Sequence, residues 1–459
     1  MDDHIYACFK RCVDRYVAEP EFRQLLLEAP AKAIKMLNYE DMLIAYKVKE
    51  AVCYIIHGQK PEGSLNAGLE GSDINTENEY LKEYIKRYKL LEGFVRNSVA
   101  ESRYKDMSLC YFGEIVRNRC QMESADVRDH KLIYYFPIAF ELTKGCSVQC
   151  DFCGFSADRL SGVFLYNEEN AALWRDILIK TRELIGPVAG VCPCYFATEP
   201  FDNPDYESFI AVYDEVFGEK PQTTTAVCER DPERFRRFIN NADPRNLRER
   251  ASVRISIRTL EHFKKVMEIF SEDELADIEL LSNHRESINR ISSSGRSRRN
   301  PEIAEKRRLR YSISCIAGLY VNMFSKTVSF MEPEMPDDEY NLGYRIRETM
   351  EFTDADDFEE CVKKLIGSYS LYDPPKDYEL SWNKNIHIDC GDDKYISFVG
   401  EGMRYKLSKG VVMLDMIRFI NEGYSFSRIA SKLGLFGSLY GSAYQRLREL
   451  YRKGYVRLR

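Results

Sequence analysis

Apolar residues between about residues 130 and 330 repeat in two different patterns along the chain. Runs such as 132–142 and 252–259 are continuous or alternate every second residue, and stretches such as 168–185 and 260–270 carry apolar residues three or four positions apart. The first pattern predicts strands and the second predicts amphipathic helices. Because strands that alternate with helices form parallel βα units, the sequence predicts an α/β domain here.

Strand and helix candidates follow one another through this region. The strand candidates are 132–142, 187–198, 222–227, 252–259, 276–282 and 310–323. The helix candidates are 168–185, 204–218, 231–241 and 260–270. Five or six βα units of this kind form a partial or full barrel, or a doubly wound sheet.

The flanking parts of the chain follow other patterns. Residues 1–125 are predicted to be helical, with prolines between the helix candidates. Residues 395–459 carry two short strand patterns, three helix patterns and a closing strand, which is the order of a winged helix. We therefore predict a helical N-terminal region (1–125), a barrel-type domain (126–350), a connecting segment (351–394) and a winged-helix-like α+β module (395–459).

The composition limits the class of protein. Hydrophobic residues make up 44%, and 66 Lys and Arg against 73 Asp and Glu give a formal charge of −7. This balance argues against general nucleic-acid binding. No apolar run approaches the length of a membrane span and the N-terminus lacks a signal-peptide pattern, so we expect a cytoplasmic protein with no membrane partner. Its 14 cysteines are then expected to be mostly reduced.

Three of these cysteines, Cys146, Cys150 and Cys153, lie close together directly after the first strand candidate. Thiolates are soft ligands that suit an iron–sulfur cluster or zinc. Structural zinc takes four ligands, usually as two separated pairs, and no second pair lies nearby. A zinc site completed by His130 is an alternative. Three thiols on one loop suit a cubane cluster with one iron left open for a small molecule.

With Phe152 before the third cysteine, the motif resembles the signature of radical S-adenosylmethionine (SAM) enzymes. The resemblance implies a partial (β/α)6 TIM-like barrel with one [4Fe–4S] cluster on Cys146, Cys150 and Cys153, and Phe152 at the cofactor site. It implies that SAM binds the open iron and is cleaved to a 5′-deoxyadenosyl radical, which takes a hydrogen from the substrate. An electron donor such as flavodoxin or ferredoxin is implied as a partner.

Residues 197–200 resemble a second motif of that superfamily, Gly-Gly-Glu-Pro, with the two glycines replaced. The resemblance implies that Glu199 accepts a hydrogen bond from the SAM ammonium, beside Thr198. A carboxylate suits a cationic amine because both partners are charged. Glu199 as a residue that begins a helix is the alternative. Ser256, on the strand candidate 252–259, either contacts the ribose or is an ordinary strand serine.

Within the radical SAM superfamily, the chain resembles the peptide epimerases of the proteusin type. Residues 140–157, 197–206, 223–235 and 312–323 carry it, in this order. Such enzymes convert selected L-residues of a ribosomally made precursor peptide to D-residues. In the implied reaction the deoxyadenosyl radical removes the Cα hydrogen of the peptide residue. A thiol on the opposite face of the resulting Cα radical then returns a hydrogen atom, which inverts the configuration. We assign this donor to Cys315, whose alternative role is that of a small buried hydrophobe.

The chain departs from the family where a further Ser-Pro-Cys is expected, because Glu332 begins the sequence Glu-Pro-Glu there. If that cysteine is the family's donor, the alternative reaction is a carbon–carbon or carbon–heteroatom cross-link or another modification. The other late cysteines are predicted to pack on a helix (Cys361) and to lie near a turn (Cys390). Three scattered cysteines cannot build auxiliary clusters, so we expect one cluster only.

The module over 395–459 resembles the precursor-recognition element of peptide-modifying systems. That resemblance implies a partner, a precursor peptide whose leader adds as a strand and whose core is modified. Structural packing and DNA binding are alternatives, the latter because basic residues crowd the last helix and strand: Arg446, Arg448, Arg452, Lys453, Arg457 and Arg459. A zinc- or DNA-binding winged-helix regulator is the non-enzymatic alternative. The basic segment 282–310 is either solvated or a docking surface for an acidic peptide or a cofactor carboxylate.

Overall fold

The structure is a computed structural model that describes most of the chain. The described residues are 1–37, 42–57, 78–87, 136–240, 253–289, 291–292, 294–300, 308–309, 316–333, 336, 338, 341–369, 373–384, 386–400, 404–410 and 412–459. The predicted helical stretch 88–125, His130 and Cys315 lie outside these ranges.

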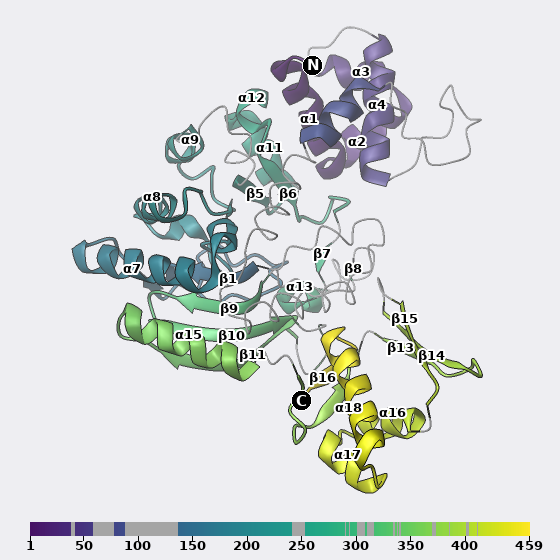
Figure 1. Cartoon of the computed structure of the whole chain (residues 1–459). Helices are drawn as coiled ribbons and strands as arrows, with labels where there is room; N and C mark the ends of the chain where they lie inside the picture. Colours follow the sequence, from purple (N-terminus) through teal and green to yellow (C-terminus); the bar gives the residue numbers. More distant parts are fainter. Residues whose placement is uncertain are drawn as a thin grey trace.

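The N-terminal part is helical, as predicted for its described residues (Figure 1). Its helices are α1 (Asp3–Ala18), α2 (Pro20–Glu28), α3 (Pro30–Lys35), α4 (Met42–His57) and a helix over 79–87. Proline occupies the first turn of α2 and of α3, where no backbone donor is lost. The Arg11 guanidinium donates to the carbonyls of Met267 and Phe270, and so ties α1 to the next region.

The central region has the alternating elements that its apolar pattern predicts. Its parallel strands are β1 (Phe136–Glu141), β4 (Thr223–Thr225), β5 (Val253–Ile257), β6 (Glu279–Ser282) and β9 (Ile316–Asn322). Its helices are α7 (Glu168–Ile185), α8 (Tyr206–Phe217), α9 (Pro232–Asn240), α11 (Leu260–Ile269) and α12 (Glu272–Leu275). The strand pairs β4–β5, β5–β6 and β1–β9 are all parallel.

The strand predicted over 187–198 is wrong. Residues Pro187–Val191 form the 3-10 helix η1, and no strand is assigned to 192–198. Pro187 fixes the backbone for a helical turn after the C-terminal glycine of α7, Gly186, which has a φ of 88°. One hydrogen bond, from Phe140 N to the Pro193 carbonyl at 3.1 Å, still ties this segment to β1.

Beyond β9 the chain turns back instead of adding another βα unit. Strands β10 (Thr327–Pro333) and β11 (Tyr344–Glu351) extend the first sheet antiparallel, in the order β1-β9-β10-β11. Helix α15 (Ala355–Tyr369) packs on this sheet and on α7. Within the described ranges the strands fall into six separate hydrogen-bonded sheets. The six-unit partial barrel therefore stays a prediction.

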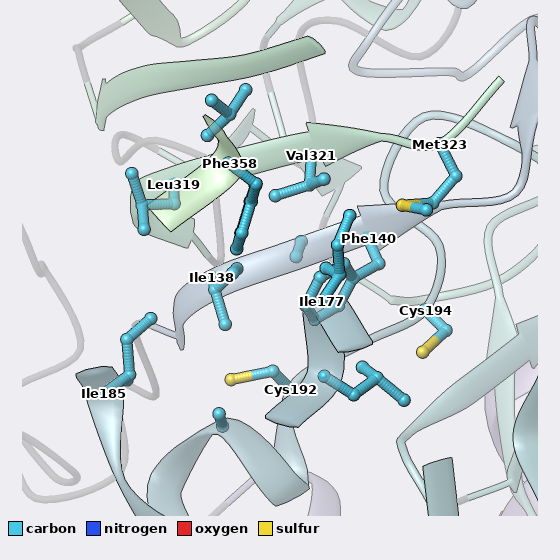
Figure 2. Close-up of a cluster of buried hydrophobic side chains, with 14 of the residues drawn as sticks. Ile138, Phe140, Ile177, Ile185, Cys192, Cys194, Leu319, Val321, Met323 and Phe358 are labelled. Carbon is cyan, nitrogen blue, oxygen red and sulfur yellow. The ribbon is translucent and has the colours of Figure 1, made fainter. Parts of the chain in front are cut away.

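The hydrophobic cluster with the most members among the described residues lies around β1, and Figure 2 shows part of it. Ile138 and Phe140 of β1 lie beside Leu319 and Val321 of β9, and Cys192 packs on the other side. All six residues of β1 are buried. A strand that is buried on both faces has a continuous apolar sequence, which is why this run was predictable.

The C-terminal module has its own hydrophobic cluster and the predicted order of elements. After β12 (Leu380–Trp382) and β13 (His387–Asp389) come β14 (Tyr395–Val399), β15 (Arg404–Ser408), α16 (Met413–Asn421), α17 (Phe426–Lys432), α18 (Gly437–Arg452) and β16 (Val456–Leu458). Strand β12 pairs with β16, and Leu380 belongs to the module's cluster. The module thus includes residues before 395.

An ion-pair group joins this module to the first sheet. Glu332 on β10 is buried and accepts from Arg345 and Arg347 on β11, at 3.1 and 2.7 Å. Arg347 also donates to the Leu458 carbonyl on β16 at 2.9 Å. Glu332 is therefore part of a structural contact.

Among the described helices, none is both long and apolar enough to cross a membrane.

Candidate functional site

A pocket of about 330 Å³ is lined by residues of two sheets, β1-β9-β10-β11 and β4-β5-β6. The start of β1, the loop after β1, the segment before η2 (Pro200–Asp202), and the strands β4, β5 and β9 contribute to its wall. Every described residue that the sequence predicts for the site lines this pocket: Cys146, Cys150, Phe152, Cys153, Thr198, Glu199 and Ser256. Residues up to 110 positions apart in the sequence, Cys146 and Ser256, thus meet in one cavity.

The predicted hydrogen donor, Cys315, lies outside the described residues. The residue after it, Ile316, begins β9 and lines the pocket. No cysteine beyond the three of the motif, and no histidine, is among the described lining residues.

The cysteine loop, residues 145–159, begins with a glycine that the fold requires. Gly145 has a φ of 81°, and a Cβ atom there would lie 2.3 Å from the Arg159 carbonyl oxygen. The Cys146 amide donates to the Asp158 carbonyl at 2.8 Å, so the loop closes on itself. Asp202, in η2, accepts from the Ser147 amide and hydroxyl at 2.8 and 2.5 Å. These contacts fix the loop above the pocket.

The three thiols are partly buried and close enough to influence one another electrostatically. Burial raises the pKa of Cys150 to about 12, and Cys146 and Cys153 add to that rise. Burial also raises the pKa of Cys146. Such thiols ionise only when a positive charge compensates them, as a bound metal does. The donor set therefore fits a thiophilic metal group that takes three protein ligands.

Glu199 lies at the pocket wall and is held by neighbouring donors. Its carboxylate accepts from Thr225 Oγ1 and the Ala226 amide, each at 2.7 Å, and from the Phe201 amide at 3.2 Å. It also caps η2, so the alternative role at a helix start is observed as well. Burial raises the pKa of Glu199 to about 7, although these hydrogen bonds act in the opposite direction. The group is thus poised to gain a charge when a cation binds beside it.

Strand β5 presents alternate residues to the pocket. Val253, Ile255 and Ile257 are buried against the helices, and Arg254 and Ser256 line the cavity. This alternation follows from the two-residue period of a strand. Ser256 is therefore a pocket residue, and the ribose contact stays a prediction.

A polar group around Arg254 of β5 also lines the pocket and was not predicted from the sequence. Arg254 Nη2 donates to the Tyr195 hydroxyl at 2.5 Å, and Arg254 Nε donates to Thr224 Oγ1 at 2.9 Å. All three residues line the pocket. The sequence could have predicted Arg254 as a pocket residue. It precedes Ser256 by two positions, and residues two apart lie on the same face of a strand.

Glu141, at the end of β1, was also missed. It is buried and accepts from the Ala197 amide at 2.6 Å, the Tyr320 hydroxyl, and Asn322 Nδ2 at 3.2 Å. Burial raises the pKa of Glu141. The carboxylate links β1, β9 and the 197–200 segment, and so positions both motifs. No local sequence pattern distinguishes it from an ordinary strand glutamate.

A second group, Cys228, Glu229 and His262, has the donor types of a metal site. His262 Nδ1, however, accepts from the Arg258 amide at 3.2 Å, so the proton sits on Nε2, which faces Glu229 at 3.0 Å. A metal on Nε2 would need that proton removed. His262 and Arg258 overcome the effect of burial and lower the pKa of Glu229 to about 2. We therefore interpret this group as a buried charge cluster.

Four other described cysteines pack against the hydrophobic clusters and do not line the pocket. Cys192 and Cys194 are buried in the cluster of Figure 2. Cys361 is buried on α15, which confirms the predicted packing role. Cys390 follows β13 and packs at the edge of the C-terminal cluster.

Comparison with known proteins finds a relative among the curated proteins. The uncharacterized protein y4wI of Sinorhizobium fredii is 30% identical over 325 residues, which are 68% of this chain and 61% of that protein. The chain thus spans about three fifths of that relative's length. No family model matches the chain. No solved structure matches it.

Replacing Glu141 with alanine is expected to destabilise the protein strongly. Three donors lose their acceptor, namely the buried Asn322 amide and the partly buried Ala197 amide and Tyr320 hydroxyl, and each unsatisfied buried group costs about 1–3 kcal/mol. We predict a loss of about 3 kcal/mol or more in the free energy of unfolding, measured in urea. Glu169→Ala, at an exposed position of α7, is the control. A loss below about 1 kcal/mol would contradict the role given to Glu141.

Glu199→Gln is expected to change how stability depends on pH. Because the folded pKa of about 7 lies above the unfolded value of 4.5, the native state holds the extra proton between them. Stability from this group is present at low pH and is lost as the pH rises to about 7. Unfolding in urea should show that wild type loses about 2–3 kcal/mol relative to the variant from about pH 5 to about pH 8. A constant difference would count against the raised pKa.

Proposed function

We propose that this chain is a radical SAM enzyme that modifies a ribosomally made peptide. The observation that carries the proposal is the convergence of three thiols, on a loop directly after a strand, with Glu199 and Ser256 in one pocket. In α/β folds, catalytic groups gather at the carboxyl ends of strands. The resemblance of both sequence motifs to this superfamily supports the same reading.

Cys146, Cys150 and Cys153 would hold one [4Fe–4S] cluster. The absence of a further cysteine or a histidine among the described pocket residues favours a metal group that keeps one position open. When bound, the cluster supplies the electron that cleaves SAM, and the protein's part is to bind, orient and exclude water.

The pocket suits SAM in size and in polarity. Its volume of about 330 Å³ is within the range of small-molecule sites. Glu199 offers a buried carboxylate beside the thiols for the SAM ammonium, and Ser256 offers a hydroxyl from β5 for the ribose. Phe152 is buried and contributes apolar surface to the same wall.

Within this class we propose peptide epimerisation, with Cys315 as the hydrogen donor. The resemblance of four ordered segments, 140–157, 197–206, 223–235 and 312–323, carries this finer reading. Peptide cross-linking is the second candidate. It is favoured by the ion pairs of Glu332 with Arg345 and Arg347, since this segment then offers a structural carboxylate where a donor thiol is expected.

We propose the precursor peptide as the partner of the C-terminal module, and a flavodoxin or ferredoxin as the electron donor. In the described residues, β13 and β15 are the edge strands of the sheet β13-β14-β15, and an extended leader could pair with such an edge.

DNA binding by the module has less support, because several of its arginines contact the protein itself. Arg448 and Arg452 pair with Asp373 at 2.6 and 2.7 Å. Arg446 donates to the Ser408 carbonyl at 2.7 Å, and Arg457 is buried.

The cysteine motif is tested by reconstituting the protein with iron and sulfide without oxygen. Wild type should be brown, hold about four iron atoms per chain and release 5′-deoxyadenosine with dithionite and SAM. Cys146→Ala, Cys150→Ala and Cys153→Ala should each lose all three properties, and Cys390→Ser should keep them. Colourless wild-type protein with stoichiometric zinc would overturn the proposal in favour of a zinc-binding regulator.

Epimerisation is tested by co-expression with the precursor gene in deuterated water. Each modified residue should gain about one mass unit, because the returning hydrogen comes from an exchangeable thiol. Cys315→Ala should keep SAM cleavage but form no D-residue. A loss of two hydrogens without deuterium uptake would instead identify a cross-linking enzyme.

A further inference from the structure

The basic segment after β7 (Ile291–Ser292) lies directly on the cysteine loop. Its helix α13 (Gly295–Arg299) begins at Gly295, where φ is 56° and a Cβ atom would lie 2.4 Å from the Gly154 carbonyl oxygen. The Gly295 amide donates to the Asn341 carbonyl at 2.8 Å. The close approach and the left-handed backbone both require glycine at this position.

Arg296 is the residue that joins α13 to the loop. Its amide donates to the Cys153 carbonyl at 2.9 Å, and its Nε donates to the Cys150 carbonyl at 2.7 Å. Its Nη1 reaches the Ala157 carbonyl at 3.0 Å and the side-chain oxygen of Gln149 at 3.1 Å. Arg296 also lines the pocket. Its side chain is therefore a planar set of hydrogen-bond donors that holds a fixed positive charge against the backbone of the cysteine loop.

Gln149 completes the arrangement from within the loop. It has a φ of 53°, which is uncommon for a residue with a side chain. Its amide nitrogen lies 2.7 Å from the Cys146 carbonyl, 3.0 Å from the Ala157 carbonyl and 2.9 Å from the Asp158 carbonyl. The carbonyl oxygens of all three motif cysteines are thus held by Gln149 or Arg296.

We propose that Gln149 and Arg296 form a clamp that holds the cysteine loop in its metal-binding conformation and that Arg296 tunes the bound cluster. This inference rests on the proposed function, since it concerns the group that the three thiols would hold. A loop fixed before binding loses less conformational entropy when the metal arrives. The positive charge of Arg296 stabilises the more negative, reduced form of the cluster, and so raises its midpoint potential.

Substitutions at Arg296 can separate its role in holding the loop from its role in tuning the cluster. Arg296→Gln removes both the positive charge and the planar set of guanidinium donors. Arg296→Lys keeps a positive charge but lacks that planar set of donors. Gln149→Asn keeps a residue that tolerates positive φ but is too short to span the loop. Arg299→Gln, at an exposed position of the same helix, is the matched control.

The experiment compares these proteins after reconstitution without oxygen. Loss of the cluster to a chelator, followed by absorbance, should be about 10- to 100-fold faster in Arg296→Gln and Gln149→Asn than in wild type and Arg299→Gln. The midpoint potential, from a dithionite titration followed by electron paramagnetic resonance, should fall in Arg296→Gln and stay near wild type in Arg296→Lys. Hydrogen exchange of residues 145–159 in the metal-free proteins should rise in Arg296→Gln, Arg296→Lys and Gln149→Asn, and should stay at the wild-type level in Arg299→Gln.

The outcomes distinguish this inference from the proposed function. If wild type binds no iron–sulfur cluster, the proposed function fails and the tuning role fails with it. If wild type holds a cluster but the Arg296→Gln and Gln149→Asn proteins match Arg299→Gln in cluster loss and exchange, the clamp is overturned. An unchanged potential in Arg296→Gln would overturn the tuning role even if the clamp holds.

Discussion

The constraint on which the site depends is the cost of gathering three partly buried thiols on one short loop. Burial raises the pKa of Cys146 and of Cys150, and the neighbouring thiols of Cys146 and Cys153 raise the pKa of Cys150 further. The loop must therefore be held open by other interactions until a positively charged group binds. The contacts of Gly145, Asp202, Gln149 and Arg296 with this loop have that effect.

The same constraint explains why so much of the surrounding structure is polar yet buried. Glu141 accepts from β9 and from the segment before Glu199, and Glu199 accepts from the end of β4. Each carboxylate connects elements that are distant in sequence. A pocket wall built in this way keeps its shape when it is empty, which favours binding of a small polar ligand with little rearrangement.

The sequence predicted the local features well where one physical signal dominated. The continuous apolar run at β1, the alternation at β5 and the helical spacing of α7 each identified their element. The spacing of the three cysteines identified the loop. The segment 187–198 was misassigned because its apolar composition suits a strand, whereas Gly186 and Pro187 begin a helical turn. Arg296 was not predicted as a partner of the loop, since its contacts lie about 140 positions away in the sequence and no periodicity encodes them.

The proposed [4Fe–4S] cluster would have one iron without a protein ligand, and SAM would bind there. Mössbauer spectra of protein reconstituted with 57Fe, recorded before and after addition of SAM, would distinguish that iron from the other three. We predict a [4Fe–4S] spectrum in which one iron site shifts when SAM is added and the others do not. A spectrum without a four-iron cluster, or one in which SAM leaves every site unchanged, would contradict the account.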